Sequence, residues 1–239
     1  MSTTHTTFSS TIQLAGREVR RVGLGTNRLT NTPANVEFIR AAVAAGLQHI
    51  DTAHLYTGGE SETTLGAALG ETRPEGVVVA TKGGFRPGEG RPDVLRAQID
   101  ESLRRLRTDV IDLYYLHRVD PETPLEESLG AIAERVEAGV IRTVGISEVS
   151  VEQIERARRV VPIAAVQNHF NMSELKHDAV VDHCTREGIV FVPFFPLRGG
   201  GSPPEALAWL LDRSPAVLPI PGTLSLEHLK ENLGALDRR

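Results

Sequence analysis

The sequence has few of the features on which cross-linking, membrane insertion or secretion depends. Its 239 residues include a single cysteine, Cys184, so no disulfide can form within the chain. No apolar run is long enough to cross a bilayer, and residues 1–10 are rich in Ser and Thr without the apolar segment of a signal peptide. We therefore expect a cytoplasmic protein whose residues 1–10 are disordered.

An excess of positive charge is also absent. Lys and Arg number 26 against 31 Asp and Glu, the formal net charge is -5, and the cations are scattered along the chain. A nucleic-acid-binding surface needs clustered cations, so we expect neither nucleic acid nor membrane as a partner. The hydrophobic content of 40% is ordinary for a globular protein, and a chain of this length can bury a sizeable core without cross-links.

What the sequence does have is a regular alternation of strand-like and helix-like segments. After a predicted hairpin around Ala15 and Gly16, a strand followed by a helix recurs eight times, and Ser225 caps the last helix. The predicted strands are Val22–Gly25, Leu47–Ile50, Val77–Thr81, Val110–Leu116, Val140–Ile146, Ile163–Val166, Ile189–Phe194 and Ala216–Ile220. Near-continuous apolar strands are typical of a parallel sheet that is buried on both faces. The pattern predicts an α/β fold, a (β/α)8 TIM barrel with an N-terminal β-hairpin, as a single domain over residues 11–239.

An open doubly wound sheet is the alternative architecture. Its dinucleotide-binding form carries the pattern G-x-G-x-x-G between a strand and a helix. The segment Gly23-Leu24-Gly25 lacks the third glycine, and no helix follows it at once. The sequence therefore favours the barrel.

Polar side chains follow three consecutive strands of the predicted barrel. Asp51 and Tyr56 come after the second strand, Lys82 after the third and His117 after the fourth. Active sites of such barrels lie at the C-terminal ends of the strands, so we expect these groups to converge. An ammonium next to a phenol favours the phenolate, a carboxylate partner holds a buried ammonium, and a histidine can donate to a substrate oxygen. The set is typical of proton exchange with a carbonyl or alcohol oxygen.

Two other interpretations of these residues stay open at this point. Taken singly, each has a structural explanation as a turn cap, a loop aromatic, a surface lysine or a satisfied histidine. A metal-dependent barrel hydrolase is a functional alternative, because several possible ligands lie close together in the sequence. Those ligands are His49, Asp51 and His54, and His117 or Asp120 could join them. This alternative leaves Tyr56 and Lys82 without a role.

Around these residues, and from about Val22 to Leu236, the chain resembles the aldo/keto reductase family. The segment HIDTAHLY, with the GESE and LG that follow it, resembles the family's first signature. The segment VATK resembles the family's lysine segment, and IDLYYLHRVD resembles its histidine segment. Its cofactor-binding segments are resembled by AGVIRTVGISE, VQNHFN, VPFFPL, and IPGT followed by EHLKEN. Within the family, VPFFPL and ALAWLLDRSP are most similar to the pyridoxal-reductase-like branch.

The resemblance implies an NADPH-dependent oxidoreductase that transfers a hydride to an aldehyde or ketone and yields an alcohol. Tyr56 would be the general acid, assisted by Lys82, Asp51 and His117. Ser147, Gln167 and Asn168 would bind the nicotinamide amide, Phe194 its ring and His228 the adenosine 2'-phosphate. The remaining cofactor-binding residues implied are Pro196, Leu197, Gly222, Thr223, Glu231 and Asn232.

The residues themselves support a phosphate site after the last two strands. Gly199–Gly201 and the pair Gly222 and Thr223 offer backbone N–H groups, the second at the start of the last helix. His228 favours NADP over NAD. The chain lacks the Lys near Gly222 and the Arg near His228 that family members often use for the 2'-phosphate.

The chain also departs from the family in its loops. Little remains between Arg198 and Glu205 of the loop that usually folds over the cofactor pyrophosphate, and three residues follow Leu236. Either the site is open and weakly selective, or a second subunit completes it in a homo-oligomer. An aromatic aldehyde such as pyridoxal is the substrate that the resemblance suggests. A nucleotide-binding regulatory or scaffolding subunit without turnover is the non-enzymatic alternative, and the complete set of catalytic residues argues against it.

Overall fold

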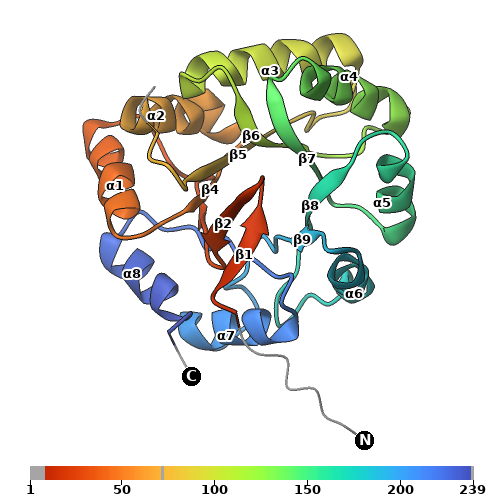
Figure 1. The fold of residues 1–239 in the computed structure, drawn as a ribbon. Coiled ribbons are helices and arrows are strands. Elements are labelled where there is room, and N and C mark those ends of the chain that lie inside the picture. The colour runs from red at the N-terminus through yellow and green to blue at the C-terminus, as the bar shows by residue number, and fades with distance from the viewer. Residues whose placement is uncertain (1–8, 71–72, 238–239) are drawn as a thin grey trace, which may run out of the picture.

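The structure, a computed structural model, describes residues 9–70 and 73–237. Within these residues a curled parallel sheet of seven strands is surrounded by helices, and a two-stranded antiparallel hairpin lies across one end (Figure 1). The strand order β3-β4-β5-β6-β7-β8-β9 follows the chain, so each strand pairs with the next one in sequence. The predicted barrel fold with its N-terminal hairpin is confirmed.

The strands and helices have the following bounds. The strands are β1 Thr11–Leu14, β2 Arg17–Arg20, β3 Leu24–Gly25, β4 His49–Asp51, β5 Val78–Gly83, β6 Ile111–Leu116, β7 Ile141–Ser147, β8 Ile163–Gln167 and β9 Val190–Phe191. The helices are α1 Pro33–Ala44, the 3-10 turn η1 Tyr56–Gly59, α2 Glu60–Leu69, α3 Pro92–Leu106, α4 Leu125–Glu137, α5 Val151–Arg158, α6 Asp178–Glu187, α7 Pro203–Arg213 and α8 Leu226–Gly234. Several helices begin where the sequence has a cap: the side chains of Thr32, Ser150 and Ser225 accept hydrogen bonds from the first turns of α1, α5 and α8.

The eighth strand, predicted over Ala216–Ile220, does not form as a continuous strand. All residues of this segment are described, and they close the barrel through isolated bridges instead of a ladder. On one side the N–H and the carbonyl of Phe191 bond to the segment at 2.8 and 2.9 Å. On the other side the carbonyls of Pro219 and Pro221 accept hydrogen bonds from the β3 segment. Proline has no N–H to donate, so continuous pairing cannot form here although the barrel is closed.

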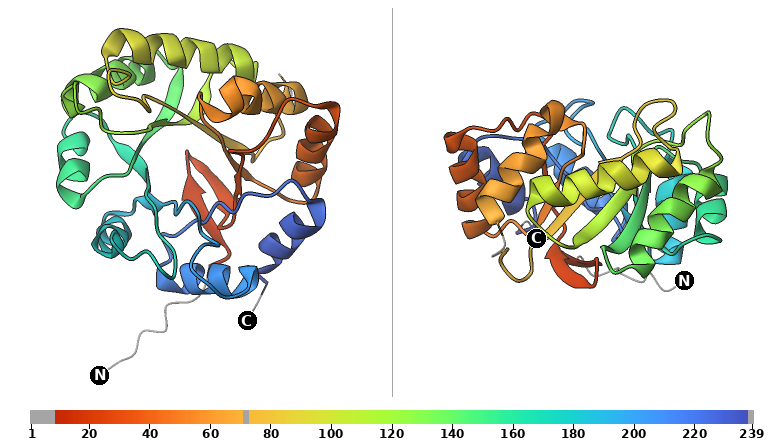
Figure 2. Two further views of the ribbon diagram at one scale, coloured as in Figure 1. Left: turned by 180° about the vertical axis from the view of Figure 1, so that it is seen from behind. Right: turned by 90° about the horizontal axis from the view of Figure 1, so that it is seen from above.

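The hairpin covers the barrel end at which the strands begin (Figure 2). Its turn places Ala15 and Gly16 at φ 51° and 73°, as a type I′ turn requires. Leu14 and Val19 are buried in one cluster with Val78, the first residue of β5. The hairpin therefore seals the N-terminal end of the barrel and leaves the opposite end for a site.

Arg21, directly after the hairpin, ties this end of the molecule together. Its buried guanidinium donates to the carbonyls of Leu211, Ser214 and Val217. The carbonyls of Ser9 and Ser10 accept hydrogen bonds from Arg21. These two residues of the segment that we predicted to be disordered are thus held in place, and residues 1–8 lie outside the described residues.

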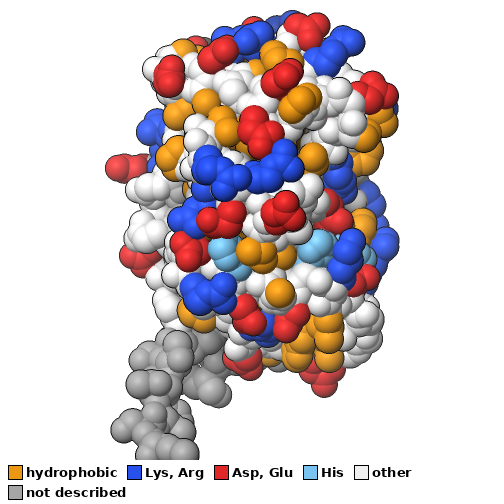
Figure 3. Space-filling model, turned by 90° about the vertical axis from the view of Figure 1, so that its right-hand side faces the viewer, with side chains coloured by type: hydrophobic (Ala, Val, Ile, Leu, Met, Phe, Trp, Pro, Cys, Tyr) orange, Lys and Arg blue, Asp and Glu red, His pale blue; other side chains and the backbone are white. Residues whose placement is uncertain are grey.

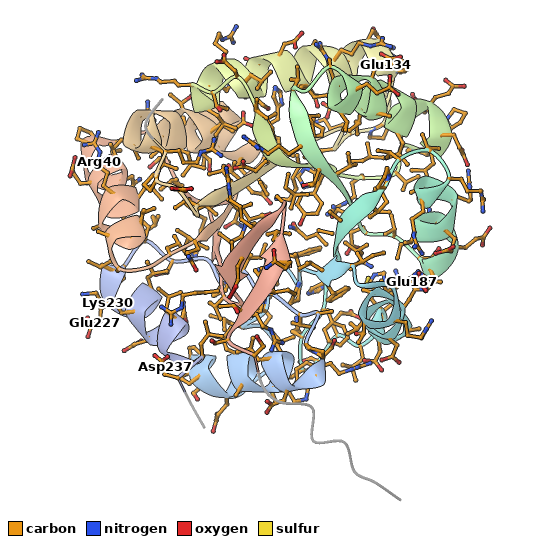
Figure 4. The ribbon with its side chains drawn as sticks, viewed as in Figure 1. Arg40, Glu134, Glu187, Glu227, Lys230 and Asp237 are labelled. Atoms are coloured by element: carbon orange, nitrogen blue, oxygen red, sulfur yellow. The ribbon has the colours of Figure 1, made fainter. Side chains whose placement is uncertain are left out.

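The strands separate two apolar layers. Leu113 and Tyr115 of β6 point into the barrel interior and join the hairpin's cluster, whereas Tyr114 and Leu116 face the surrounding helices. The outer faces of the helices carry charged side chains such as the labelled Arg40 and Glu134 (Figure 4). Positive and negative groups are interspersed on the side shown in Figure 3. None of the described helices is long and apolar enough to span a membrane.

Candidate active site

The buried pair Asp51 and Lys82 forms the base of the site. Asp51 ends β4 and Lys82 lies near the end of β5, and these strands are neighbours in the sheet. Lys82 Nζ donates to Asp51 Oδ1 at 2.5 Å and to the Thr52 carbonyl at 2.7 Å. Gln167 Nε2 donates to the other carboxylate oxygen at 2.8 Å. Both oxygens of this buried carboxylate therefore have a hydrogen-bond donor.

Lys82 is fully buried, and its charge depends on its neighbours. Burial by itself lowers the pKa of a lysine, but the charge of Asp51 and the proximity of Tyr56 outweigh burial and raise the pKa of Lys82. Its Nζ lies 5.0 Å from the centroid of the Tyr56 ring. The structure thus holds a charged ammonium beside the tyrosine at neutral pH.

Tyr56 begins η1, a tight turn that depends on left-handed backbone conformations. Thr57, Gly58 and Gly59 have φ of 50°, 66° and 94°. A hydrogen bond holds the turn in place: Thr57 Oγ1 donates to the Leu29 carbonyl at 2.9 Å. A Cβ at Gly59 would lie 2.3 Å from Arg105 Cζ, so both conformation and space require glycine there.

His117 follows β6 directly and faces the tyrosine edge-on. The two ring centroids are 6.0 Å apart at an interplanar angle of 79°. Burial, together with the charges of Lys82 and Arg118, holds the pKa of His117 well below its usual range. Its Nδ1 has no hydrogen-bond partner among the described residues. The imidazole is therefore neutral at physiological pH and can donate a single N–H to a ligand.

These groups open into a cavity of about 550 Å³, within the usual size of small-molecule sites. Its walls include the catalytic candidates Asp51, Tyr56 and His117, the aromatic Phe85, Phe194 and Phe195, and the cationic Arg28, Arg118 and Arg198. A second cavity of about 530 Å³ is lined by residues that include Thr223, His228, Glu231 and Asn232. Arg28, Leu197 and Gly222 border both cavities, so the two adjoin and an extended ligand can reach from one to the other.

The structure brings most of the predicted cofactor residues to these cavities. Gln167, Phe194, Pro196, Leu197 and Gly222 line the first cavity. Leu197, Gly222, Thr223, His228, Glu231 and Asn232 line the second cavity.

Ser147, Asn168 and the three glycines Gly199–Gly201 are placed differently. Ser147 is buried, and its hydroxyl accepts a hydrogen bond from Arg118 Nη1 at 3.1 Å. The buried amide of Asn168 exchanges two hydrogen bonds with the backbone of Val149 and so braces the loop between β7 and α5. Gly199 packs against the loop after β8 rather than against a cavity. The hydroxyl of Ser147 and the amide of Asn168 each keep a further donor beside these contacts.

Two ligands of the metal-site alternative, His54 and Asp120, have other partners. His54 Nε2 lies 2.9 Å from Glu101, and Asp120 accepts hydrogen bonds from the backbone of Gly88 and Gly90. His49 is buried, and burial lowers its pKa to about 4. In residues 9–70 and 73–237, no group of three His, Cys, Asp or Glu side chains is placed to hold a metal. The proposed metal ligands therefore do not form a coordination site in the described residues.

Sequence reasoning missed several cavity residues, and Arg118 is the most informative. It follows His117 within the segment LHRVD, so it too comes at a strand end, where barrels place their functional groups. Phe85 lies three residues beyond Lys82, so it also follows the end of a strand, and the same rule could have pointed to it. Arg28 comes from the loop after β3, and no periodicity indicates how far its side chain reaches.

A (β/α)8 barrel with a tyrosine, a buried lysine–aspartate pair and a neutral histidine at its C-terminal mouth defines a class of barrel oxidoreductases. Comparison with known sequences supports the same class of protein. The sequence model described as "Aldo/keto reductase family" matches residues 21–205, and the chain belongs to that family.

Relatives and solved structures extend the similarity over nearly the whole chain. The chain is 34% identical to an uncharacterized oxidoreductase of Schizosaccharomyces pombe, over 95% of this chain and 85% of that protein. It is 32% identical to pyridoxine 4-dehydrogenase of Escherichia coli, over 95% of this chain and 93% of that protein. A thermostable aldo-keto reductase in complex with the inhibitor epalrestat superposes with a TM-score of 0.86 at 32% identity, covering 96% of this chain and 94% of that one. An aldo-keto reductase from Klebsiella pneumoniae in complex with NADPH gives 0.84 at 27% identity, covering 96% and 90%.

Proposed function

We propose that the protein reduces an aldehyde or ketone to an alcohol with NADPH, and that Tyr56 delivers the proton. NADPH-dependent carbonyl reduction is the activity of the family to which the chain belongs. The observation that carries the roles of the individual residues is the buried ammonium of Lys82 beside the Tyr56 ring, in a cavity that His117 also lines.

The chain's own residues account for the proton. NADPH, when bound, supplies the hydride to the carbonyl carbon, and the carbonyl oxygen gains the corresponding negative charge. The Tyr56 hydroxyl gives its proton to that oxygen, and the positive charge of Lys82 stabilises the phenolate that remains. The neutral His117 donates a hydrogen bond to the same oxygen and orients the carbonyl. Asp51 keeps Lys82 charged, because the pair is buried together.

The adjoining cavities fit a long, anionic cofactor. Gly222 and Thr223 precede α8, whose N-terminus offers backbone N–H groups to a phosphate. His228 lines the same cavity and is proposed to bind the 2'-phosphate. Arg28 reaches this cavity from the loop after β3, and it supplies the cation that the sequence lacks near Gly222. This arrangement supports a preference for NADPH over NADH.

The cavity walls favour a flat substrate. Phe85, Phe194 and Phe195 line the space around Tyr56 and His117, and aromatic rings stack well on planar molecules. Together with the similarity to pyridoxine 4-dehydrogenase, these rings support an aromatic aldehyde, with pyridoxal as the first candidate to assay.

The exchange of Tyr56 for phenylalanine tests the assignment. It removes the hydroxyl and keeps the ring, so turnover of an aldehyde should fall by about 100-fold to 10,000-fold. NADPH binding, followed by the emission of the bound cofactor in titrations of both proteins, should stay nearly unchanged. A variant that retains wild-type turnover would exclude Tyr56 as the acid. Tight NADPH binding by the wild-type protein without oxidation by any of a panel of aldehydes would favour a regulatory subunit instead.

A further inference from the structure

Arg118 is a cation without a counter-ion at the reacting end of the cavity. No carboxylate among the described residues lies within ion-pair distance of it, and Glu148 acts on it only from farther away. Its Nη1 donates to the His117 carbonyl at 2.6 Å and to Ser147 at 3.1 Å. Its Nε and Nη2 make no hydrogen bond to any described residue. Half of this donor fork therefore remains for a ligand.

The guanidinium lies close to the groups proposed to react. Its central carbon is 5.2 Å from the centroid of the Phe85 ring and 5.8 Å from that of Phe194. The Phe85 ring in turn lies 4.8 Å from the His117 ring. Arg118 thus stands between two aromatic walls, one ring away from the imidazole that would orient the carbonyl.

The other two arginines of the cavity are placed for a different task. Arg28 and Arg198 are exposed, and Arg28 borders the second cavity as well. Arg198 stacks on the Phe195 ring, with its guanidinium carbon 3.9 Å from the ring centroid. These two cations suit the phosphates of the cofactor, whereas Arg118 is half-buried beside His117.

The acidic groups of the cavity do not balance this charge. Asp51 is the only carboxylate among the residues that line it, and both oxygens of Asp51 are already bonded, to Lys82 and to Gln167. The reacting end of the cavity therefore carries excess positive charge in partly buried surroundings. A half-buried guanidinium is costly unless it is paired, so the charge calls for an anion.

We propose that the natural substrate is a carbonyl compound with an anionic oxygen group, a carboxylate or a phosphate, on a flat or apolar body, and that Arg118 binds this group. The Nε and Nη2 edge of the guanidinium would donate hydrogen bonds to two oxygens of this group, the bidentate geometry that arginine favours. Phe85 and Phe194 would hold the body between Arg118 and the carbonyl. The inference rests on the proposed reductase function and narrows its substrate class.

Matched substrates test the inference, because they differ only in charge. 4-Carboxybenzaldehyde is compared with its neutral methyl ester, and pyridoxal 5'-phosphate with pyridoxal. The carboxylate or the phosphate, whichever is the native group, should have a KM about tenfold or more below that of its neutral partner. The pair that shows the preference identifies the anion.

Arg118→Met separates specificity from a structural role. It should abolish the preference by raising KM for the anionic substrate, with kcat for the neutral substrate little changed, and Arg118→Lys should restore part of it. Calorimetric titration of 4-(hydroxymethyl)benzoate into the protein with NADP should show the same loss of affinity in the Met variant. Arg159→Met, a control at an exposed arginine outside both cavities, should leave the ratio of the two KM values as it is.

The outcomes that would overturn the inference differ from those that would overturn the function. Equal KM values for charged and neutral partners, or an equal fall in kcat for all substrates in Arg118→Met, would contradict a substrate-binding role while leaving the reductase intact. If none of the four aldehydes is reduced although NADPH binds, the proposed function itself is wrong.

Discussion

Asp51 is the residue on which the charge of the site depends. One of its oxygens bonds to Lys82 and the other to Gln167, so the carboxylate has donors on both sides although it is buried. The carboxylate in turn helps to raise the pKa of Lys82 and so keeps the buried ammonium charged. Gln167 therefore acts on the carboxylate in this structure, whereas the resemblance assigned it to the nicotinamide.

At the scale of single residues, the sequence predicted that the candidate catalytic groups lie together, but it did not predict their hydrogen-bond partners. Asp51, Tyr56, Lys82 and His117 could be found because the ends of consecutive parallel strands must meet at one mouth. The engagement of Asn168 with Val149 could not be found in this way, since it depends on where a side chain turns after the strand ends. For the same reason, the sequence could not show that the Arg28 side chain borders both cavities.

The buried His49 should make the protein less stable in mild acid. Its folded-state pKa is lowered to about 4 by burial, so between pH 6.5 and 4 the unfolded chain binds more protons than the folded protein. The free energy of unfolding should therefore fall as the pH falls through this range, by about 2 kcal/mol between pH 7.5 and 5.0 from His49 alone. His117 acts in the same direction.

Urea denaturation at both pH values measures this loss. His49→Gln carries no charge at either pH, so its stability should depend less on pH, even if it is lower overall. An unchanged pH dependence in the variant would show that His49 is not a source of it.

At the scale of elements, η1 has the strictest requirements. It places Tyr56 by a run of left-handed residues that ends at Gly59, whose φ is 94° and whose α-hydrogens face Arg105. Gly59→Ala should cost about 1–3 kcal/mol, because the new methyl group meets the guanidinium and the backbone is strained. The displaced turn should also lower kcat.

Gly130→Ala is the matched control for this change. Gly130 lies inside α4, and a Cβ there would meet nothing within 4 Å. Alanine should stabilise the helix by about 0.5–1 kcal/mol and leave kcat alone. Thermal unfolding and steady-state rates of both variants check the pair, and a Gly59→Ala protein as stable and active as Gly130→Ala would contradict the role of the turn.

The elements also show where periodicity is a sufficient guide. The apolar periodicity of the sequence predicts a helix over Pro92–Leu106, and α3 has these bounds, because Pro92 starts it and its apolar stripe is long. The strand predicted over Ile189–Phe194 is formed only at Val190–Phe191. An apolar run reports burial but not pairing, and Pro219 and Pro221 were the signal that the last segment could not pair continuously.

At the scale of the whole molecule, the single thiol reports on opening of the fold. Cys184 lies in α6, is fully buried, and burial raises its pKa to about 12. The folded protein should therefore react with a disulfide reagent at pH 8 only through opening, and in denaturant it should react at once with one equivalent. Saturating NADPH should slow the reaction, because the cofactor stabilises the folded state. Rapid, complete labelling without denaturant would contradict this burial.

The closing seam of the barrel has a consequence for synthesis on the ribosome. The segment 216–222 bonds to β9 on one side and to β3 on the other, yet β3 (Leu24–Gly25) is made about 190 residues earlier. At the usual speed of synthesis, about 5–20 residues per second, the open edge of β3 waits roughly 10 to 40 seconds for its last neighbour. During that interval the nascent chain exposes a sheet edge and the apolar face of α1. We expect the ring to close only after residues 216–222 have left the exit tunnel, with the finished barrel forming late and all at once.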